Sequence, residues 1–283
     1  MQIVLFPGQG SQAKGMGEAL FDRFGDMTAE ADRVLGYSIR ELCVDDPRSE
    51  LAQTQFTQPA LFVVNALMYR ARLDDGGAVP AFVAGHSLGE YNALLAAGCF
   101  EFATGLTMVK ERGALMGRVS GGGMSAVIGL EPAAIQEVLE ASDAGRRLDV
   151  ANFNSFEQTV IAGPKEDLDA LKPALETAGA RMVVPLNVSA PFHSRYMRDA
   201  QREFEQCLQT FEFRAPAIPV ISNVDARPYE GDVRTTLAAQ IGSSVRWLDS
   251  MLYLLEQPEP AFEEVGPGQV LTKLLRQIQK RRR

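Results

Sequence analysis

The chain has 283 residues, of which 46% are hydrophobic and 23% charged, a composition typical of a globular protein with a sizeable core. Its 28 basic and 36 acidic residues give a net charge of −8, which argues against a nucleic-acid binder. The three cysteines are far apart and lack metal-ligand spacing, so we expect free thiols in a reducing compartment and no metal site. No apolar run is long enough for a signal peptide or a membrane span, so we expect a cytoplasmic protein with no membrane partner.

The N-terminal segment has the pattern of a buried strand followed by a glycine-rich loop. The apolar run at 3–6 predicts a strand over 2–6, and the loop at 7–12 precedes a helix expected over 15–24. The glycines nearly match a dinucleotide fingerprint, but their spacing fails and no acidic residue follows at the required distance. The other interpretation is a loop whose main-chain N–H supplies an oxyanion donor, with Gln9 as the candidate.

Two helices are expected next, over 27–35 and 58–73, with a polar loop at 45–55 between them. Pro59 would then lie in the first turn of the second helix, where its missing N–H costs no hydrogen bond. A glycine-containing turn at 74–77 ends this part of the chain.

The pentapeptide at 85–89, Gly-His-Ser-Leu-Gly, has the G-x-S-x-G pattern of a nucleophile elbow. Apolar residues at 81–84 predict a buried strand before it, and the Leu/Ala-rich residues 88–97 predict a helix after it. A serine on such a sharp strand-to-helix turn exposes its hydroxyl, and the new helix directs N–H groups at any oxyanion formed there. Ser87 is therefore the candidate nucleophile.

A triple glycine at 121–123 separates two kinds of sequence. The segment after it has strand and helix patterns in the order β-α-β-β-α-β, which is typical of a ferredoxin-like unit. We predict an α/β fold in which residues 1–121 and 189–283 form a large domain and residues 122–188 form a small ferredoxin-like domain inserted in it. Further helices of the large domain are expected at 102–116, 194–208, 235–241 and 247–255, and further strands at 219–222 and 262–265.

The chain ends in a last helix and the basic tail Lys280–Arg283. One interpretation of this tail is a solvated, frayed helix end. The other is a docking site for an acidic partner.

A serine nucleophile needs a general base, because its free hydroxyl is poorly nucleophilic at neutral pH. The chain has two histidines. His86 is adjacent to Ser87 on the elbow and is expected to point away from it, so His193 is almost the only candidate base. No acidic residue between Ser87 and His193 stands out as a triad member, and a carbonyl could orient the imidazole instead.

Arg112 lies near the end of the helix expected at 102–116 and could reach the pocket beside the elbow. It is either a surface arginine at a helix C-terminus or a bidentate clamp on a substrate carboxylate, which a planar guanidinium suits. Its spacing alone favours neither role.

The motifs of this chain resemble, in order and over essentially its whole length, those of the malonyl-CoA:acyl carrier protein transacylases. Within that family the chain is most similar to discrete acyltransferases that serve polyketide synthases whose modules lack their own. The motifs that carry the resemblance are FPGQGSQ at 6–12, FTQPAL at 56–61, GHSLGEY at 85–91, RG at 112–113, ANFNS at 151–155, HS at 193–194 and EVGPG at 264–268.

For catalysis, the resemblance implies Ser87 as the nucleophile and His193 as the base. The main-chain N–H groups of Gln9 and Leu88 would bind the oxyanion, and a carbonyl of Gln240 would orient the imidazole. It also implies an α/β-hydrolase-like large domain with the ferredoxin-like insert. No metal or redox cofactor is implied.

For the substrate, the resemblance implies that Arg112 holds the malonyl carboxylate. Gln58 and Met116 match pocket-lining positions and Asn154 a position near the substrate; helix capping, core packing and a turn are the alternative roles of these three residues. Phe192 resembles the bulky residue that malonyl-selective members carry before the histidine, where it would crowd a substituent on the α-carbon.

The implied activity is that of an acyl-carrier-protein S-malonyltransferase in polyketide synthesis. It would move malonyl from malonyl-CoA to the phosphopantetheine thiol of an acyl carrier protein through a malonyl-Ser87 ester, with ping-pong kinetics. Malonyl transfer for fatty-acid synthesis is one alternative. The others are an acyl hydrolase with the same Ser/His pair, against which Arg112 argues because neutral acyl chains carry no carboxylate, and a non-catalytic carrier-binding subunit.

Overall fold

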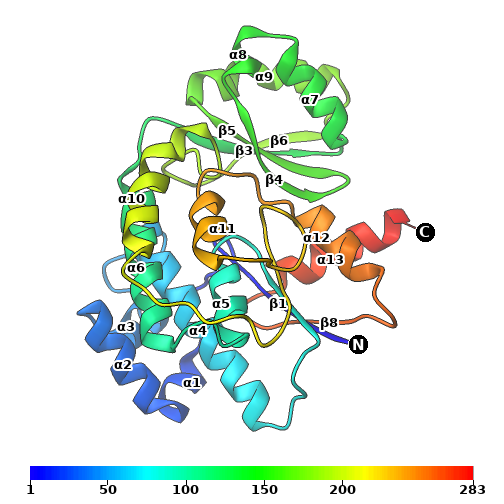
Figure 1. Ribbon diagram of the computed structural model, residues 1–283. Helices are drawn as coiled ribbons and strands as arrows, with labels where there is room; N and C mark the ends of the chain where they lie inside the picture. The colour runs from blue at the N-terminus through cyan, green and yellow to red at the C-terminus, as the bar shows by residue number, and fades with distance from the viewer. Residues whose placement is uncertain (283) are drawn as a thin grey trace.

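Two four-stranded sheets organise the chain, of which the computed structural model describes residues 1–282 (Figure 1). Every strand pair of the first sheet is parallel. Its strands, in sheet order, are β7 (Val220–Ile221), β2 (Phe82–Gly85), β1 (Gln2–Phe6) and β8 (Ala261–Glu264). Phe6 at the end of β1 lies opposite Gly85 at the end of β2, so the loops after both strands begin side by side at one edge of the sheet.

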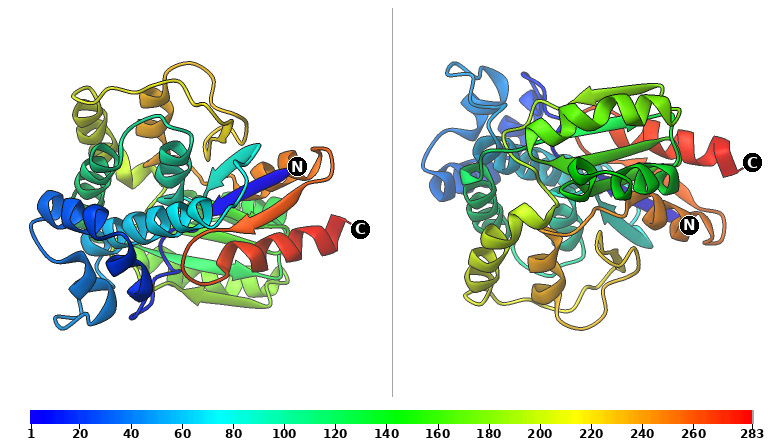
Figure 2. Two further views of the ribbon diagram at one scale, coloured as in Figure 1. Left: turned by 90° about the horizontal axis from the view of Figure 1, so that it is seen from below. Right: turned by 90° about the horizontal axis from the view of Figure 1, so that it is seen from above.

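The first sheet is buried on both faces. Alternate side chains of β1 enter two different hydrophobic clusters, Val4 and Phe6 on one face and Ile3 and Leu5 on the other. Burial on both faces explains why this strand is a continuous apolar run. Two groups of helices cover the faces (Figure 2): α4 (Thr54–Asp74), α5 (Gly89–Ala96) and α6 (Phe102–Arg118) on the first, and α12 (Trp247–Leu255) and α13 (Val270–Arg282) on the second.

Shorter helices surround the first face. Three of them, from the N-terminal part of the sequence, pack against α4 or α6, and the other two pack against each other, one of them also against α6. Among residues 1–282, no helix is long and apolar enough to cross a membrane. The shorter helices are α1 (Glu18–Arg23), α2 (Gly25–Leu35), α3 (Ile39–Val44), α10 (Arg198–Leu208), which follows a 3-10 turn at Arg195–Met197, and α11 (Val233–Gln240).

The second sheet is antiparallel and lies at one end of the molecule (Figure 1). Its sheet order is β4-β5-β3-β6, which is the order of a ferredoxin-like unit, so the predicted fold class is confirmed. Its elements fall between residues 123 and 185, inside the predicted small domain, whose limits at 122 and 188 stay a prediction. The strands are β3 (Gly123–Ile128), β4 (Asp149–Ser155), β5 (Gln158–Gly163) and β6 (Met182–Pro185), and the helices are α7 (Pro132–Glu140), α8 (Asp143–Arg146) and α9 (Lys165–Thr177).

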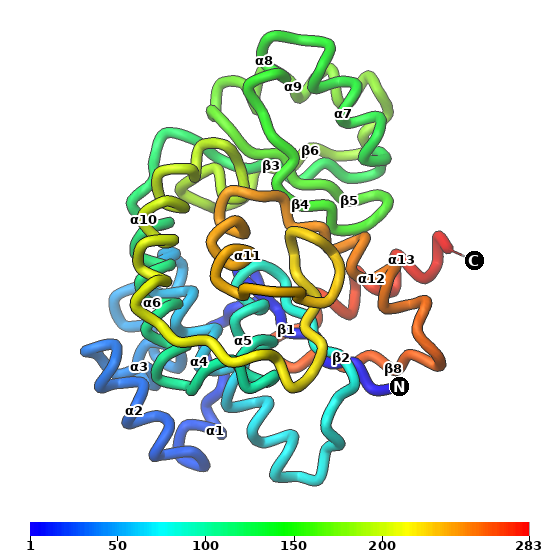
Figure 3. The backbone as a smooth tube through the Cα atoms, in the orientation of Figure 1, coloured from blue at the N-terminus to red at the C-terminus, as the bar shows by residue number. Residues whose placement is uncertain are grey.

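A short piece of β structure joins the small sheet to the segment between α11 and α12. Asn152 of β4 forms an isolated parallel bridge with Val245, in the segment between α11 and α12 that runs beside β4 in Figure 3. Val245 N–H donates to the Ala151 carbonyl at 2.8 Å, and Phe153 N–H donates to the Val245 carbonyl at 2.9 Å. The small sheet is therefore held against the segment that follows Gln240, close to the site described below.

The structure corrects two predictions about helix α4. The helix begins at Thr54, not at residue 58, and Pro59 is inside it, not in its first turn. The extra turn forms because the Gln53 carbonyl accepts hydrogen bonds from the N–H groups of Phe56 and Thr57, while the Phe56 ring packs edge-on against Tyr37. The pyrrolidine of Pro59 therefore removes one hydrogen bond from the helix interior.

The basic tail is helical as far as it is described. Helix α13 continues to Arg282, and Arg281 pairs with Glu131 of the small sheet's first loop at 2.8 Å. The predicted frayed end therefore does not include Lys280 or Arg281, while Arg283 lies outside the described residues.

Candidate active site

Ser87 occupies the sharp turn between β2 and α5 that its sequence motif predicts. Its backbone is left-handed, with φ of 51°, which projects the hydroxyl away from the sheet. Gly85 is required at this turn, because a Cβ there would lie 1.9 Å from the main-chain carbon of Gly89. The side chain of Asn223, after β7, supports the elbow: its Oδ1 accepts from Ser87 N–H and its Nδ2 donates to the Gly85 carbonyl, each at 2.7 Å.

His193 meets Ser87 directly, with Nε2 at 2.7 Å from Oγ. Its other ring nitrogen, Nδ1, is 2.9 Å from the Gln240 carbonyl and 3.2 Å from the Ser243 carbonyl. Because carbonyls only accept, Nδ1 carries the proton and Nε2 is left to accept from the serine. Burial and the nearby charge of Arg112 lower the pKa of His193 to about 3, so the imidazole is neutral at physiological pH.

The loop after β1 lies against the elbow. A Cβ at Gly8 would be 2.3 Å from the His86 carbonyl and 3.5 Å from the Leu88 nitrogen, so only glycine permits this approach. Among the hydrogen bonds of residues 1–282, none uses the main-chain N–H of Gln9 or of Leu88. These two donors are thus available beside Ser87, as the resemblance implies.

Arg112 is fully buried and faces the nucleophile, which rules out a surface role. Its Nη2 lies 3.2 Å from Ser87 Oγ and donates to Gln240 Oε1 at 2.8 Å. Its Nη1 donates to Gln58 Oε1 at 2.7 Å, and its guanidinium lies over the Tyr91 ring with 5.3 Å to the centroid. The guanidinium is held by neutral groups on several sides and remains a cation beside the serine hydroxyl.

Ser87 opens into a cavity of about 100 Å³, which we call the serine cavity. Residues from the neighbourhood of both sheets form its walls, which are largely apolar. Asn154 is not among the lining residues: its Oδ1 is 2.8 Å from His86 Nε2, one layer behind the wall. The lining includes Gln9, Gln58, His86, Leu88, Arg112, Met116, Met124, Asn152, Leu186, Val188, Phe192 and His193.

The predicted pocket residues differ in what they contact. Phe192 is buried in the cavity wall directly before His193. Gln58 bridges Arg112 and the sulfur of Met116, to which its Nε2 donates at 3.4 Å, so both residues support the guanidinium. The His86 ring packs beside Trp247, and its Nε2 forms a hydrogen bond with Asn154. The imidazole therefore interacts with Asn154 and not with Ser87, as expected.

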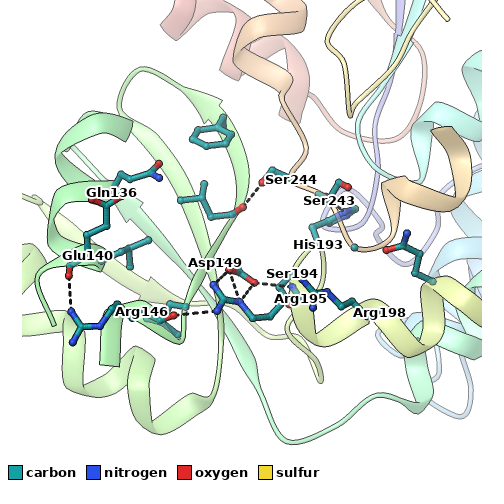
Figure 4. A pocket seen from close by; sticks show the side chains of 17 residues that line it. Gln136, Glu140, Arg146, Asp149, His193, Ser194, Arg195, Arg198, Ser243 and Ser244 are labelled. Atoms are coloured by element: carbon teal, nitrogen blue, oxygen red, sulfur yellow. Dashed lines mark hydrogen bonds and ion pairs between the residues drawn. The ribbon is translucent and has the colours of Figure 1, made fainter. Parts of the chain in front are cut away.

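A larger groove, of about 970 Å³, reaches His193 from outside (Figure 4). We call it the His193 groove. One wall comes from α7, α8 and β4, and the other from residues 193–201 and 242–244. Arg195 crosses it to pair with Asp149, its Nε donating to Oδ1 at 2.9 Å, whereas Arg198 forms none of the ion pairs found among residues 1–282. His193 lines both the groove and the serine cavity, whereas Ser87 lines only the serine cavity.

Some residues of the site were not predicted from the sequence. Asn223 and Ser243 reach it from loops whose sequence has no distinctive motif, and Tyr229 bonds to Glu90 behind it. Glu90 did give a signal: it is the only charged residue of the apolar segment 88–97, and it is fully buried. An acidic residue inside a buried helix needs partners, and its partners belong to the site.

Residues 3–281 match the model of one family, the acyl transferase domain. BaeC of Bacillus velezensis, a polyketide biosynthesis malonyl CoA-acyl carrier protein transacylase, is 54% identical over 280 residues, which are 98% of this chain and 96% of BaeC. The polyketide biosynthesis protein ThaF of Burkholderia thailandensis is also 54% identical over 98% of this chain, but the chain spans only 24% of ThaF.

Solved structures agree with this match. The crystal structure of a malonyl CoA-acyl carrier protein transacylase from Burkholderia pseudomallei has a TM-score of 0.95 and 51% identity, covering 99% of this chain and 98% of that one. A type II PKS acyl-carrier protein in complex with its malonyl-transacylase gives 0.94 and 37%, covering 99% and 93% of the two chains. The match spans both sheets and the Ser87–His193 pair between them. The chain therefore belongs to the acyl transferase domain family.

Proposed function

We propose that this protein moves malonyl groups from malonyl-CoA to the phosphopantetheine thiol of an acyl carrier protein. One observation carries the proposal: the buried guanidinium of Arg112 lies 3.2 Å from the hydroxyl of Ser87. A cation enclosed beside the nucleophile suits an acyl group that ends in a carboxylate, because a neutral acyl chain would leave the charge without a partner. The names of the relatives support the same substrate class.

In the first half-reaction, Ser87 Oγ attacks the thioester carbonyl while His193 Nε2 takes its proton. The oxyanion of the tetrahedral intermediate accepts from the N–H groups of Gln9 and Leu88. The C–S bond then breaks, and the CoA thiolate leaves with the proton from His193. The Gln240 carbonyl stabilises the imidazolium that exists between these proton transfers.

In the second half-reaction, the carrier's phosphopantetheine thiol replaces CoA. His193 removes the thiol proton, the sulfur attacks the malonyl-Ser87 ester, and the same two N–H groups bind the oxyanion. The C–O bond to Ser87 breaks, and Oγ recovers its proton from His193. Both half-reactions use one base and one oxyanion site, so ping-pong kinetics are expected.

The His193 groove is the route we assign to the thiol-bearing arm. His193 is among its lining residues, the groove is far larger than the serine cavity, and the exposed cation Arg198 also lines it. Cationic side chains there suit the phosphate of the arm and the acidic surface that carrier proteins usually present. The structure of the related malonyl-transacylase with its carrier supports a carrier as the partner.

We place the reaction in polyketide synthesis, because relatives named for polyketide biosynthesis are 54% identical to this chain. We place it in the cytoplasm, which the free thiols of its three cysteines favour. No step above calls for a metal or redox cofactor, since the base and the N–H donors balance every proton and charge. Both the location and the lack of a cofactor stay predictions.

The proposed transfer is tested by measuring whether the malonyl group on Ser87 passes to the carrier thiol or to water. Enzyme loaded with malonyl-CoA and freed of excess is mixed with holo-carrier protein or with buffer, and malonyl-carrier and free malonate are measured. We expect malonyl on the carrier thiol well before free malonate appears. Faster release of malonate, with carrier present, would make the protein a hydrolase, and failure to load at all would make it a non-catalytic subunit.

A further inference from the structure

We propose that Glu90 is a positioning residue of this reaction: its carboxylate fixes the amide orientation of Gln240, and Gln240 in turn fixes the Arg112 guanidinium. The inference rests on the proposed function for the identity of the bound acyl group. Glu90 does not line the serine cavity and touches no reacting atom, so its action on the substrate passes through Gln240.

Glu90 is a fully buried carboxyl with three hydrogen-bond donors around it. Oε1 accepts from the Tyr229 hydroxyl at 2.5 Å and from Asn223 N–H at 3.2 Å. Oε2 accepts from Gln240 Nε2 at 2.6 Å. A buried acid is costly unless each oxygen is satisfied, and here both are, so its place in the first turn of α5 is tolerated.

Gln240 connects four parts of the site. Its Nε2 donates to Glu90 and, at 2.8 Å, to the carbonyl of Ser87. Its Oε1 accepts from Arg112 Nη2, and its main-chain carbonyl accepts from His193 Nδ1. The side-chain amide thus links a buried anion to a buried cation, while the main chain orients the base.

The direction of this amide is set by Arg112 on its oxygen side and by Glu90 and the Ser87 carbonyl on its nitrogen side. The oxygen has to face Arg112, because a guanidinium only donates, and the NH₂ group then faces Glu90, which has to accept. Burial raises the pKa of Glu90 to about 7, and either protonation state satisfies the requirement, because a proton on Oε1 can be donated to the Tyr229 hydroxyl while Oε2 still accepts.

An amide in place of the Glu90 carboxylate would place two hydrogen-bond donors opposite each other. Its oxygen would keep the Tyr229 and Asn223 donors, so its NH₂ group would face the NH₂ group of Gln240. A rotation of the Gln240 amide would relieve that contact but turn an NH₂ group toward the Arg112 guanidinium. Rotation removes the acceptor of Arg112, and without rotation the repulsion between the two NH₂ groups displaces the amide that holds Arg112, so in both cases the guanidinium is less firmly positioned.

The test compares Glu90→Gln with Tyr229→Phe. Glu90→Gln keeps shape and reverses one hydrogen-bond group, whereas Tyr229→Phe removes a donor from the same carboxyl and leaves the Oε2 acceptor toward Gln240 intact. Single-turnover acylation of Ser87 is followed by intact-protein mass with malonyl-CoA and with acetyl-CoA, after thermal unfolding shows that each variant is folded.

For Glu90→Gln we expect kcat/KM with malonyl-CoA to fall about 10- to 100-fold, carried mostly by KM, and acetylation to change less than about 3-fold. Tyr229→Phe should retain the wild-type ratio of the two acyl groups. An unchanged malonyl rate in Glu90→Gln, an equal loss for both thioesters, or the same change of ratio in Tyr229→Phe would overturn the inference. Wild-type protein that forms no malonyl ester would instead overturn the proposed function itself.

Discussion

The main-chain oxygen of Gln240 lies 2.9 Å from Nδ1 of His193, in the place where many serine enzymes have a carboxylate. A neutral carbonyl fixes the tautomer but does not stabilise an imidazolium as strongly as an anion would. The cation of Arg112 and burial further disfavour the protonated ring, and the pKa of His193 is lowered to about 3. The imidazole is therefore neutral and able to accept a proton at physiological pH.

We first predict that the rate of Ser87 acylation does not fall at mildly acidic pH. Because only the neutral imidazole acts as a base, kcat/KM with malonyl-CoA should stay constant within about 2-fold from about pH 5 to pH 8, where a free histidine would titrate near 6.5. Rapid-quench acylation at a series of pH values measures it. A fall of the rate through a pKa near 6.5 would contradict the geometry.

The same lowered pKa makes this histidine a source of acid instability. Between the folded pKa of about 3 and an unfolded value near 6.5, the unfolded state binds more protons, so this group's contribution to the free energy of unfolding rises with pH in that window. His193→Gln should therefore lose less thermal stability than the wild type between about pH 7 and pH 5. Equal losses in both proteins, measured by calorimetry, would contradict this prediction.

Removal of the His193 imidazole should leave malonyl-CoA binding intact but slow the acylation of Ser87. We expect His193→Ala to slow malonylation of Ser87 by about 1000-fold, because the hydroxyl then has no acceptor at 2.7 Å for its proton. The thermal midpoint and the affinity for malonyl-CoA serve as controls. A loss below about 10-fold would mean that another group acts as the base.

Arg112 should decide between acyl groups. In Arg112→Met, which keeps an apolar stem of similar length, malonylation should fall about 100-fold and acetylation far less, because only malonyl carries a carboxylate for the guanidinium. Single-turnover rates with the two thioesters measure the ratio. If both rates fall equally, the guanidinium supports the structure of the cavity and not the substrate.

Phe192 should limit the size of the α-carbon substituent. The ring is buried in the wall of the serine cavity next to His193, so Phe192→Ala should raise kcat/KM for methylmalonyl-CoA relative to malonyl-CoA about 10-fold or more. Competition between the two thioesters, read by mass on Ser87, gives the ratio. No change in it would assign acyl selectivity to another part of the wall.

The elbow and the order of helices and strands in the small domain could be predicted because they depend on short-range patterns. Residues 81–97 contain a buried strand, a sharp turn and a helix in one stretch, and the structure has β2, Ser87 and α5 there. The helix start at Thr54 could not be predicted, since the Phe56–Tyr37 contact that supports its first turn joins residues far apart in the sequence.

Only part of the site can be predicted from short stretches of the sequence. Ser87 and His193 follow from the motif and from the scarcity of histidines. The role of the Gln240 carbonyl could only come from the family resemblance, because every residue has a carbonyl and its direction is set by the fold. Glu90 and Asn223 are polar side chains whose partners lie more than a hundred residues away, so their function is visible only in the folded chain.

The most direct test of the account is the mass of the intact protein after brief exposure to malonyl-CoA, with acetyl-CoA and a Ser87→Ala variant in parallel. We expect one malonyl adduct on the wild-type protein, little acetyl adduct, none on Ser87→Ala, and loss of the adduct when a holo-carrier protein is added. A malonyl adduct that persists in Ser87→Ala, or no adduct on the wild-type protein, would contradict the assignment of Ser87 as the acyl-bearing nucleophile.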